Sequence, residues 1–198
     1  MIRLTIFCVL VFAGAAQACP LISRPDTMLF VRAERLYEAT DQVALEALRP
    51  QLEAAFDRAP DPADPTCAGK LNVYGKVALA LGWLRAQSGD HEGSRAIFVR
   101  GTVYTPMDMA LAHEAAFSLI ELERYDEALI AVDALLIRKP LDKKAKAGLF
   151  RSRGYALIGL ERWDEAEKAF KASLKLEPGN MQAKYELQYI ADNRNPAS

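Results

Sequence analysis

Apolar residues recur at spacings of three and four along most of the chain, and this period predicts amphipathic helices and an all-α fold. Turn residues, glycine and proline separate the periodic stretches. The predicted helices cover residues 27–39, 42–58, 71–88, a stretch after Gly89-Asp90 that ends near residue 100, 107–122, 127–138, two stretches within 147–180, and 181–193.

Residues 27–58 predict a helical hairpin near the start of the chain. Pro20 to Pro25 should be extended, and Asp26 is placed to cap the first helix. Pro50 lacks an N–H and crowds the preceding turn, so it should kink or split the second helix. The proline- and aspartate-rich segment from Ala59 to Cys67 should be a loop without a helix. One interpretation of the hairpin is a degenerate first copy of the repeat described next.

The clearest unit is Ala147 to Asn180, in which two helical patterns flank a short turn. Gly154 lies in the first pattern, WDEA opens the second and LEPGN closes the unit. Two weaker copies precede it with a common offset of 34 residues, which relates Ser94 to Ala128, Phe98 to Val132 and Pro106 to Pro140. The next step is 38 residues, from Ala128 to Ala166 and from Pro140 to Pro178, and the four extra residues are assigned to a polar loop at 141–146.

This pattern resembles the tetratricopeptide repeat family over about residues 75–180. The positions that match its pattern directly are Leu81-Gly82, Gly154, Ala166, Phe170 and Pro178. Arg153 occupies a place that is usually leucine, and Ala115-Ala116 replace a usual Leu-Gly pair. The resemblance implies a right-handed superhelical stack of helix-turn-helix repeats at 75–108, 109–142 and 147–180, with a capping helix at 181–193 and a disordered tail at 194–198.

The first eighteen residues have the features of a secretory signal peptide. Arg3 supplies the positive start, residues 4–16 carry no charge, and Ala16-Gln17-Ala18 is a cleavage signal. No later run is long and apolar enough to cross a bilayer. The chain is therefore expected to be periplasmic or secreted, and residues 19–68 are expected to form a hairpin and loop ahead of the repeats.

Cys19 and Cys67 are the two cysteines that remain after signal cleavage, since Cys8 is removed. An even pair in an oxidising compartment predicts a disulfide. It would close a loop of about 50 residues and stabilise the fold by about 4 kcal/mol in the entropic description. The alternative is a lipid anchor at Cys19, which the preceding residues support only loosely.

Catalytic and metal-binding chemistry finds little support in the sequence, and we expect neither an enzyme nor a bound cofactor or metal. His91 and His113 have no partner at a metal-ligand spacing. The sequence contains neither a phosphate-binding glycine loop nor a nucleophile elbow. A net charge of −1 gives no sign of nucleic-acid binding.

Four aromatic residues occupy equivalent places in successive first helices, and we call them the aromatic row: Trp83, Phe117, Tyr155 and Tyr189. Their separations of 34, 38 and 34 residues follow the repeat. The resemblance places them on the concave surface, where aromatic side chains suit peptide binding. One helical turn earlier, the same face carries His113, Glu114, Arg151, Tyr185 and Glu186. The alternative is that the row serves packing between repeats, or that the N-terminal hairpin covers it.

Three functional hypotheses follow. The first is a non-catalytic adaptor of the bacterial cell envelope, with a partner peptide or helix in the concave groove. The second is a structural subunit of an envelope complex, which uses the convex face, the terminal helix or a lipid at Cys19. The third is an accessory domain of an enzyme system. The basic clamp of chaperone-tail-binding members is not evident, because alanine, glycine and glutamate occupy its places.

Overall fold

The structure is a computed structural model that describes residue 19, residues 23–67 and residues 71–194. The described residues form ten α-helices and one short 3₁₀ helix, Pro65–Cys67, which confirms the predicted all-α class. The α-helices are α1 Arg24–Glu38, α2 Gln42–Glu46, α3 Arg49–Asp57, α4 Asn72–Gln87, α5 His91–Tyr104, α6 Met109–Glu121, α7 Tyr125–Leu136, α8 Lys143–Gly159, α9 Trp163–Leu176 and α10 Met181–Arg194. None of them is long and apolar enough to span a bilayer.

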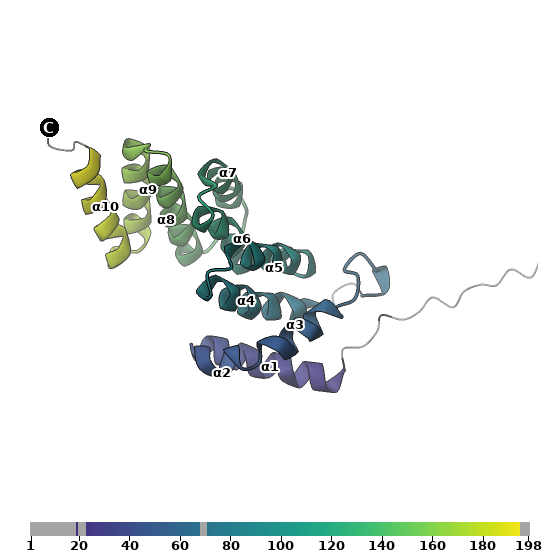
Figure 1. Cartoon of the computed structure of the whole chain (residues 1–198). Coiled ribbons are helices and arrows are strands. Elements are labelled where there is room, and N and C mark those ends of the chain that lie inside the picture. The colour runs from purple at the N-terminus through teal and green to yellow at the C-terminus, as the bar shows by residue number, and fades with distance from the viewer. Residues whose placement is uncertain (1–18, 20–22, 68–70, 195–198) are drawn as a thin grey trace, which may run out of the picture.

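From α4 onward the helices form a stack of antiparallel pairs, α4 with α5, α6 with α7, and α8 with α9, and α10 closes one end (Figure 1). We call α4, α6 and α8 the first helices and α5, α7 and α9 the second helices. Each first helix contacts the next first helix, and α1 contacts α4 at the other end of the stack. The expected stack of helical repeats is therefore confirmed.

In each of the two outer repeats, a glycine of the first helix packs against a phenylalanine of the second helix. A Cβ atom at Gly82 would lie 2.6 Å from Cζ of Phe98, and one at Gly154 would lie 2.6 Å from Cζ of Phe170. Both phenylalanines are buried, so each ring lies directly on its partner helix. The middle repeat has Ala116 where the outer repeats have glycine, and Val132 where they have phenylalanine.

The buried residues form three clusters rather than one. The first joins α1–α5 and includes the disulfide and Leu111. The last joins the α7–α10 region and extends to Leu119. Between them lies a small cluster of four buried residues, Ala116, Val132, Leu135 and Leu149. The middle repeat is thus the most thinly packed part of the stack.

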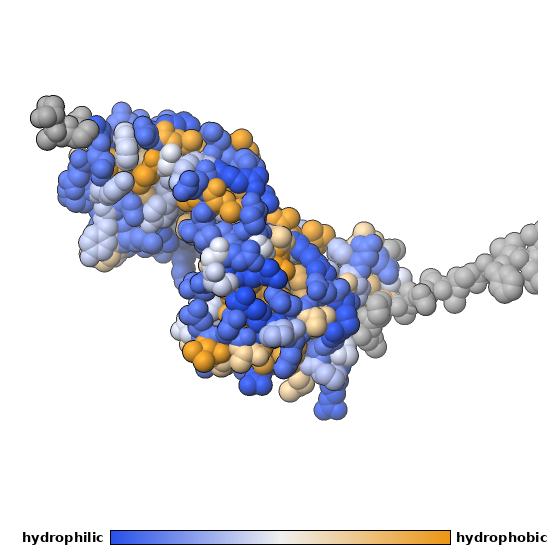
Figure 2. Space-filling model, viewed as in Figure 1, coloured by the Kyte–Doolittle hydropathy of each residue, from blue (hydrophilic) through white to orange (hydrophobic). Residues whose placement is uncertain are grey.

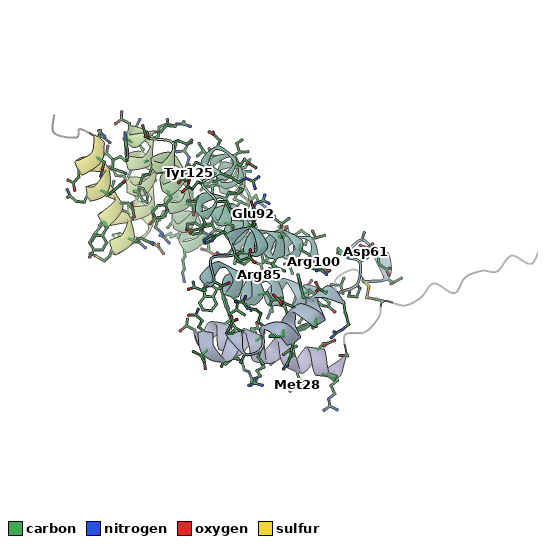
Figure 3. The ribbon with its side chains drawn as sticks, viewed as in Figure 1. Met28, Asp61, Arg85, Glu92, Arg100 and Tyr125 are labelled. Carbon is green, nitrogen blue, oxygen red and sulfur yellow. A yellow bond between two sulfur atoms is a disulfide. The ribbon has the colours of Figure 1, made fainter. Side chains whose placement is uncertain are left out.

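The N-terminal hairpin packs against α4 at the end of the stack. Arg100 of α5 donates to the backbone oxygen of Phe56 at 2.7 Å, and its guanidinium lies 4.4 Å from the centre of the Phe56 ring. Arg85 of α4 pairs with Glu53 of α3 at 2.8 Å. Figure 3 labels both arginines, which lie between α3 and the first repeat. These contacts join the hairpin to the first repeat through Arg100 of α5 and Arg85 of α4.

The disulfide predicted from the cysteine pair is present between Cys19 and Cys67, with Cα atoms 4.8 Å apart. Figure 3 shows it as a yellow bond close to the loop that carries Asp61. Both cysteines are buried and belong to the first hydrophobic cluster. The bond therefore ties the start of the described chain to the loop that precedes α4.

Three predictions about the N-terminal segment need comment. Pro50 does split the second helix, since α2 ends at Glu46 and α3 begins at Arg49. The predicted cap at Asp26 is wrong, because α1 begins at Arg24 with Ser23 as its N-cap and Pro25 in its first turn. Proline is tolerated there because the first helical N–H groups need no intrahelical acceptor. The loop from Ala59 contains a 3₁₀ turn at Pro65–Cys67 rather than no helix.

The predicted polar loop at 141–146 is also wrong. Asp142 caps α8 through its side chain, which accepts from the N–H of Ala145, and the helix begins at Lys143. The helix α8 has 17 residues and α6 has 13, so the four inserted residues lengthen the helix by one turn. The insertion is accommodated without a change in the repeat packing behind it.

The ends of the remaining helices differ from the prediction by a few residues. The helix α5 continues to Tyr104 instead of ending near residue 100, and α7 begins at Tyr125. The capping helix α10 extends to Arg194, whose guanidinium pairs with Glu167 at 2.6 Å. The predicted signal peptide, the segment 20–22 and the rest of the predicted tail, 195–198, lie outside the described residues.

Candidate peptide-binding face of the first helices

The structure places the aromatic row on α4, α6, α8 and α10, one residue on each helix. Only its middle pair is in ring contact among the described residues, with Phe117 and Tyr155 edge to face at 6.4 Å between ring centroids. Trp83, Phe117 and Tyr155 are half-buried, and Tyr189 is 47% exposed. The row is therefore accessible along its length, and its two ends contact aromatic residues outside it.

Tyr37 extends the aromatic row by one position at the N-terminal end. Its ring meets Trp83 edge to face at 5.9 Å, and it comes from α1, which contacts α4 as a further first helix would. Sequence analysis missed this residue because the hairpin has no repeat markers, although the interpretation as a degenerate repeat pointed to it. The contact covers one side of Trp83, while α1 itself stays at the end of the stack (Figure 1).

Tyr189 at the other end contacts Trp163, the first residue of α9, at 6.3 Å between ring centroids. Tyr185 lies one turn earlier on α10 and is 67% exposed. Tyr155 also packs on Phe170 at 5.3 Å, so its ring links this face to the core. In the C-terminal half of the row, Tyr155 of α8 is thus packed on the core, whereas Tyr189 of α10 is about half exposed.

Two carboxylates face the row. Glu186 of α10 accepts a hydrogen bond from the Tyr155 hydroxyl, and burial together with this carboxylate raises the pKa of Tyr155. Burial raises the pKa of Glu186 and of Glu114. Burial, with the charge of Glu114 as a second cause, raises the pKa of Tyr37. The structure therefore brings Glu114 close to the Tyr37 end of the row and Glu186 close to its middle.

His113 and Arg151, which the sequence placed on the same face, are used between helices. The Nε2 atom of His113 lies 2.7 Å from the Ser152 hydroxyl, which joins α6 to α8. Arg151 pairs with Glu177 at 2.5 Å and donates to the Ser173 hydroxyl at 3.3 Å, both at the C-terminal end of α9. Its charge is neutralised within its own repeat. Glu114 and Glu186 remain as acidic groups beside the row.

Comparison with known proteins fits this geometry. Residues 147–180 match the sequence profile of the family described as "Tetratricopeptide repeat". Residues 147–180 are therefore similar to one tetratricopeptide repeat, the segment that comprises α8, α9 and the turn after them. No curated protein matches the chain in sequence.

Solved structures with the same tetratricopeptide fold include two kinds of protein. The second tetratricopeptide domain of human RPAP3, determined in complex with the HSP70 peptide SGPTIEEVD, is 27% identical, with a TM-score of 0.51 over 58% of this chain and 92% of that one. The first domain of human RPAP3 is 21% identical, with a TM-score of 0.55 over 61% and 92%. MamA from Desulfovibrio magneticus is 16% identical, with a TM-score of 0.59 over 88% of each chain.

The tetratricopeptide stack contains no candidate metal centre among its described residues, 19, 23–67 and 71–194, because no three His, Cys, Asp or Glu side chains lie close enough together. The Cys19 and Cys67 sulfurs are joined to each other.

His113 should make the stability of the protein sensitive to acid. Burial, with the charge of Arg151 as a second cause, lowers its pKa from 6.5 to about 4. The unfolded chain binds the proton at higher pH than the folded chain, so stability present above the unfolded pKa of 6.5 is lost as the pH falls towards 4. Between about pH 7 and about pH 5 the wild type should lose about 1–2 kcal/mol more free energy of unfolding than His113→Gln.

Urea unfolding at the two pH values measures this difference. Glu114 and Glu186, whose raised pKa values act in the opposite direction, are present in both proteins and cancel in the comparison. Equal losses in wild type and variant would show that His113 is protonated in the folded protein at an ordinary pH.

Proposed function

We propose that the protein is a non-catalytic binding protein that holds a peptide or helix of a partner protein along its first helices. The observation that carries the proposal is the accessible aromatic row, with the edge-to-face pair Phe117–Tyr155 at its centre. Aromatic side chains bury large areas with few rotamers to restrict, and such residues dominate binding energy at protein interfaces. The RPAP3 domain bound to an HSP70 peptide supports a peptide as the ligand class.

The charge of the face argues for a different peptide from the acidic one in that complex. Glu114 and Glu186 are two acidic groups near the row, and the guanidinium of Arg151 is paired with Glu177. An acidic segment would be repelled by the two carboxylates, whose raised pKa values already reflect burial. We propose a ligand with apolar side chains and neutral or basic groups.

We place this activity in the bacterial cell envelope, in the periplasm or outside the cell. The charged start, apolar stretch and cleavage signal of residues 1–18 support secretion. The Cys19–Cys67 disulfide is compatible with an oxidising compartment. Mass spectrometry of the mature N-terminus tests this placement: cleavage after Ala18 is expected, and a diacylglyceryl group on Cys19 would instead support the lipid-anchored alternative.

Removing the aromatic row should abolish partner capture. In a variant with Trp83, Phe117 and Tyr155 all changed to Ala, we expect affinity for partners from periplasmic extract to fall at least about tenfold, because each ring contributes buried contact area. The measurement is quantitative capture on immobilised protein, with circular dichroism as the check on folding.

A matched control changes three exposed apolar residues elsewhere, Met28, Val31 and Val43, to Ala. It should capture the same partners as the wild type. Because the three rings are half-buried, a second variant with Leu at the same three positions keeps apolar volume while it removes the rings. A folded leucine variant with unchanged capture would refute the proposed binding face.

A second candidate function is an assembly contact through the terminal helix. Met181, Tyr185 and Tyr189 of α10 are 52%, 67% and 47% exposed, and their spacing of four residues places them along one side of the helix. An exposed stripe of this kind suits a contact with a neighbouring subunit. Phe117→Ala distinguishes the two functions, because it should weaken binding along the aromatic row and leave an assembly contact through α10 unchanged.

A further inference from the structure

A hollow lies between the second helices α5 and α7. It has a volume of about 360 Å³, and its floor is formed by α6. We call it the α5–α7 groove. Its lining residues are Arg95, Val99, Thr102 and Pro106 on one wall, Ala112, Ala115, Ala116 and Leu119 on the floor, and Ala131, Leu135 and Arg138 on the other wall. Most of these side chains are small or apolar.

The groove exists in part because α6 carries Ala115 where the other first helices carry larger residues. The repeat register relates Ala115 to Leu81 in the first repeat and to Arg153 in the third. Leu81 is fully buried, and Arg153 donates to Asp133 of α7 at 2.8 Å, so it occupies the corresponding position beside α7. Ala112 is related to Phe150 in the third repeat and to Ala78 in the first. The departure at Ala115 thus leaves a hollow that its counterparts fill.

Exposed apolar residues are found on the helices that form the groove, and one of them, Val99, lines it. Of the eleven large hydrophobic residues exposed in the described chain, five lie on or beside α5 and α7, namely Val99, Val103, Met107, Ile130 and Ile137. Figure 2 shows hydrophobic residues gathered over the region of α5, α6 and α7. The second helix of the third repeat differs, because its exposed positions are Asp164, Lys168, Lys171 and Lys175. Exposed apolar surface of this kind marks an interaction site.

An arginine stands near each end of the groove. Arg95 lies in the first turns of α5, and its buried Nε has no hydrogen-bond partner. The hydrogen bond from Arg124, with the charge of Arg95 as a lesser cause, lowers the pKa of Glu127, whose carboxylate pairs with Arg124 at 2.6 Å. Arg138 follows α7 and donates to the backbone oxygen of Pro106 at 2.6 Å. From Arg95 to Pro106 the wall extends about 16 Å, or about three helical turns.

We infer that the α5–α7 groove binds an amphipathic helix of a partner protein, with bulky apolar side chains in the hollow and a carboxylate near each end. The small floor admits large side chains, which a flat helical surface would not. The arginines, together with the exposed Lys139, Lys143 and Lys144 beyond Arg138, attract acidic groups. This ligand is opposite in charge to the one proposed for the first helices, so the two faces take different partners.

Synthetic helices provide the test on the complete mature chain. One probe is a peptide of about four turns with leucines along one face and a glutamate near each end, about three turns apart. The second probe replaces the two glutamates with lysines. Fluorescence anisotropy measures affinity, and the methyl NMR signals of the floor alanines 112, 115 and 116 report the place of binding. We expect the glutamate peptide to bind at least about tenfold more tightly and to shift these signals.

Filling the groove should remove this binding. Ala115→Leu introduces the residue found at the same register in the first repeat, so the melting temperature should not fall. It should weaken binding of the glutamate peptide at least about tenfold. Arg95→Gln with Arg138→Gln should remove the preference for glutamate over lysine. Ala54→Leu, at an exposed position of α3, is the matched control and should bind as the wild type does.

The result that overturns the inference is equal binding of both peptides, no shift of the floor methyl signals, or unchanged affinity in Ala115→Leu. A second copy of the chain would be the occupant if sedimentation showed a dimer that Ala115→Leu dissociates. The variant that lacks Trp83, Phe117 and Tyr155 should still bind the glutamate peptide. Its behaviour separates failure at this groove from failure at the aromatic row.

Discussion

Gly154→Ala should lower the free energy of unfolding by about 2–3 kcal/mol, although alanine is the better helix former. The new Cβ would lie 2.6 Å from Cζ of Phe170 and closer still to another atom of the ring. Phe170 is fully buried, and its ring also contacts Tyr155, so it has no free space to enter. Either the α8–α9 pair separates or the ring leaves its rotamer. Urea unfolding followed by circular dichroism measures the loss.

A double-mutant cycle tests the stated cause. Phe170→Val removes the ring and should itself cost about 2–3 kcal/mol through the cavity that it leaves. The double variant reproduces the Ala116–Val132 pair of the middle repeat, so it should be less destabilised than the sum of the two single variants by about 1–2 kcal/mol. Additive losses would show that the overlap between Gly154 and Phe170 is not what limits stability.

Replacing both Cys19 and Cys67 with Ser should lower the free energy of unfolding by about 2–4 kcal/mol. The bond closes a long loop that contains the whole hairpin, since the cysteines are 48 positions apart. Both cysteines are buried beside the residues that join α1–α3 to α4. Two buried serine hydroxyls also replace an apolar bond, which adds to the loss.

Hydrogen exchange locates the effect of this double substitution. Amides of α1–α3 should lose protection, whereas those of α8–α10, in a separate hydrophobic cluster, should keep it. Reduction of the wild type with dithiothreitol should reproduce the result. Uniform loss of protection from α1 to α10 would contradict the separation of the hairpin from the C-terminal repeats.

The repeat register explains why the fold could be predicted from the sequence. Small residues such as Gly82 and Gly154 recur opposite large ones, and this pairing survives wherever two helices must approach closely. Helix ends were harder to predict because they depend on single capping contacts. Ser23 rather than Asp26 caps α1, and Asp142 begins α8 inside a segment that looks like a loop.

The candidate site was predictable only in part, since register places a residue on a helix face but does not give its partners. The aromatic row follows directly from the repeat, because its four members are separated by 34, 38 and 34 positions. The pairing of Arg151 with Glu177 did not, because the two residues are 26 positions apart on different helices. Tyr37 could not be found because it lies in a helix without repeat markers. The α5–α7 groove could not be found because it depends on the small side chain of Ala115, which leaves space that a larger side chain would fill.

The division of the core into three clusters has a mechanical consequence. A stack whose neighbours contact only each other transmits force and cooperativity through each junction in turn, and the junction with least buried area yields first. Here that junction is the middle repeat, where four buried residues connect the two larger clusters. We therefore expect the chain to unfold as two blocks that separate at the junction between α6, α7 and the start of α8. A partner helix bound in the α5–α7 groove would stabilise this junction, and the two blocks would then unfold together.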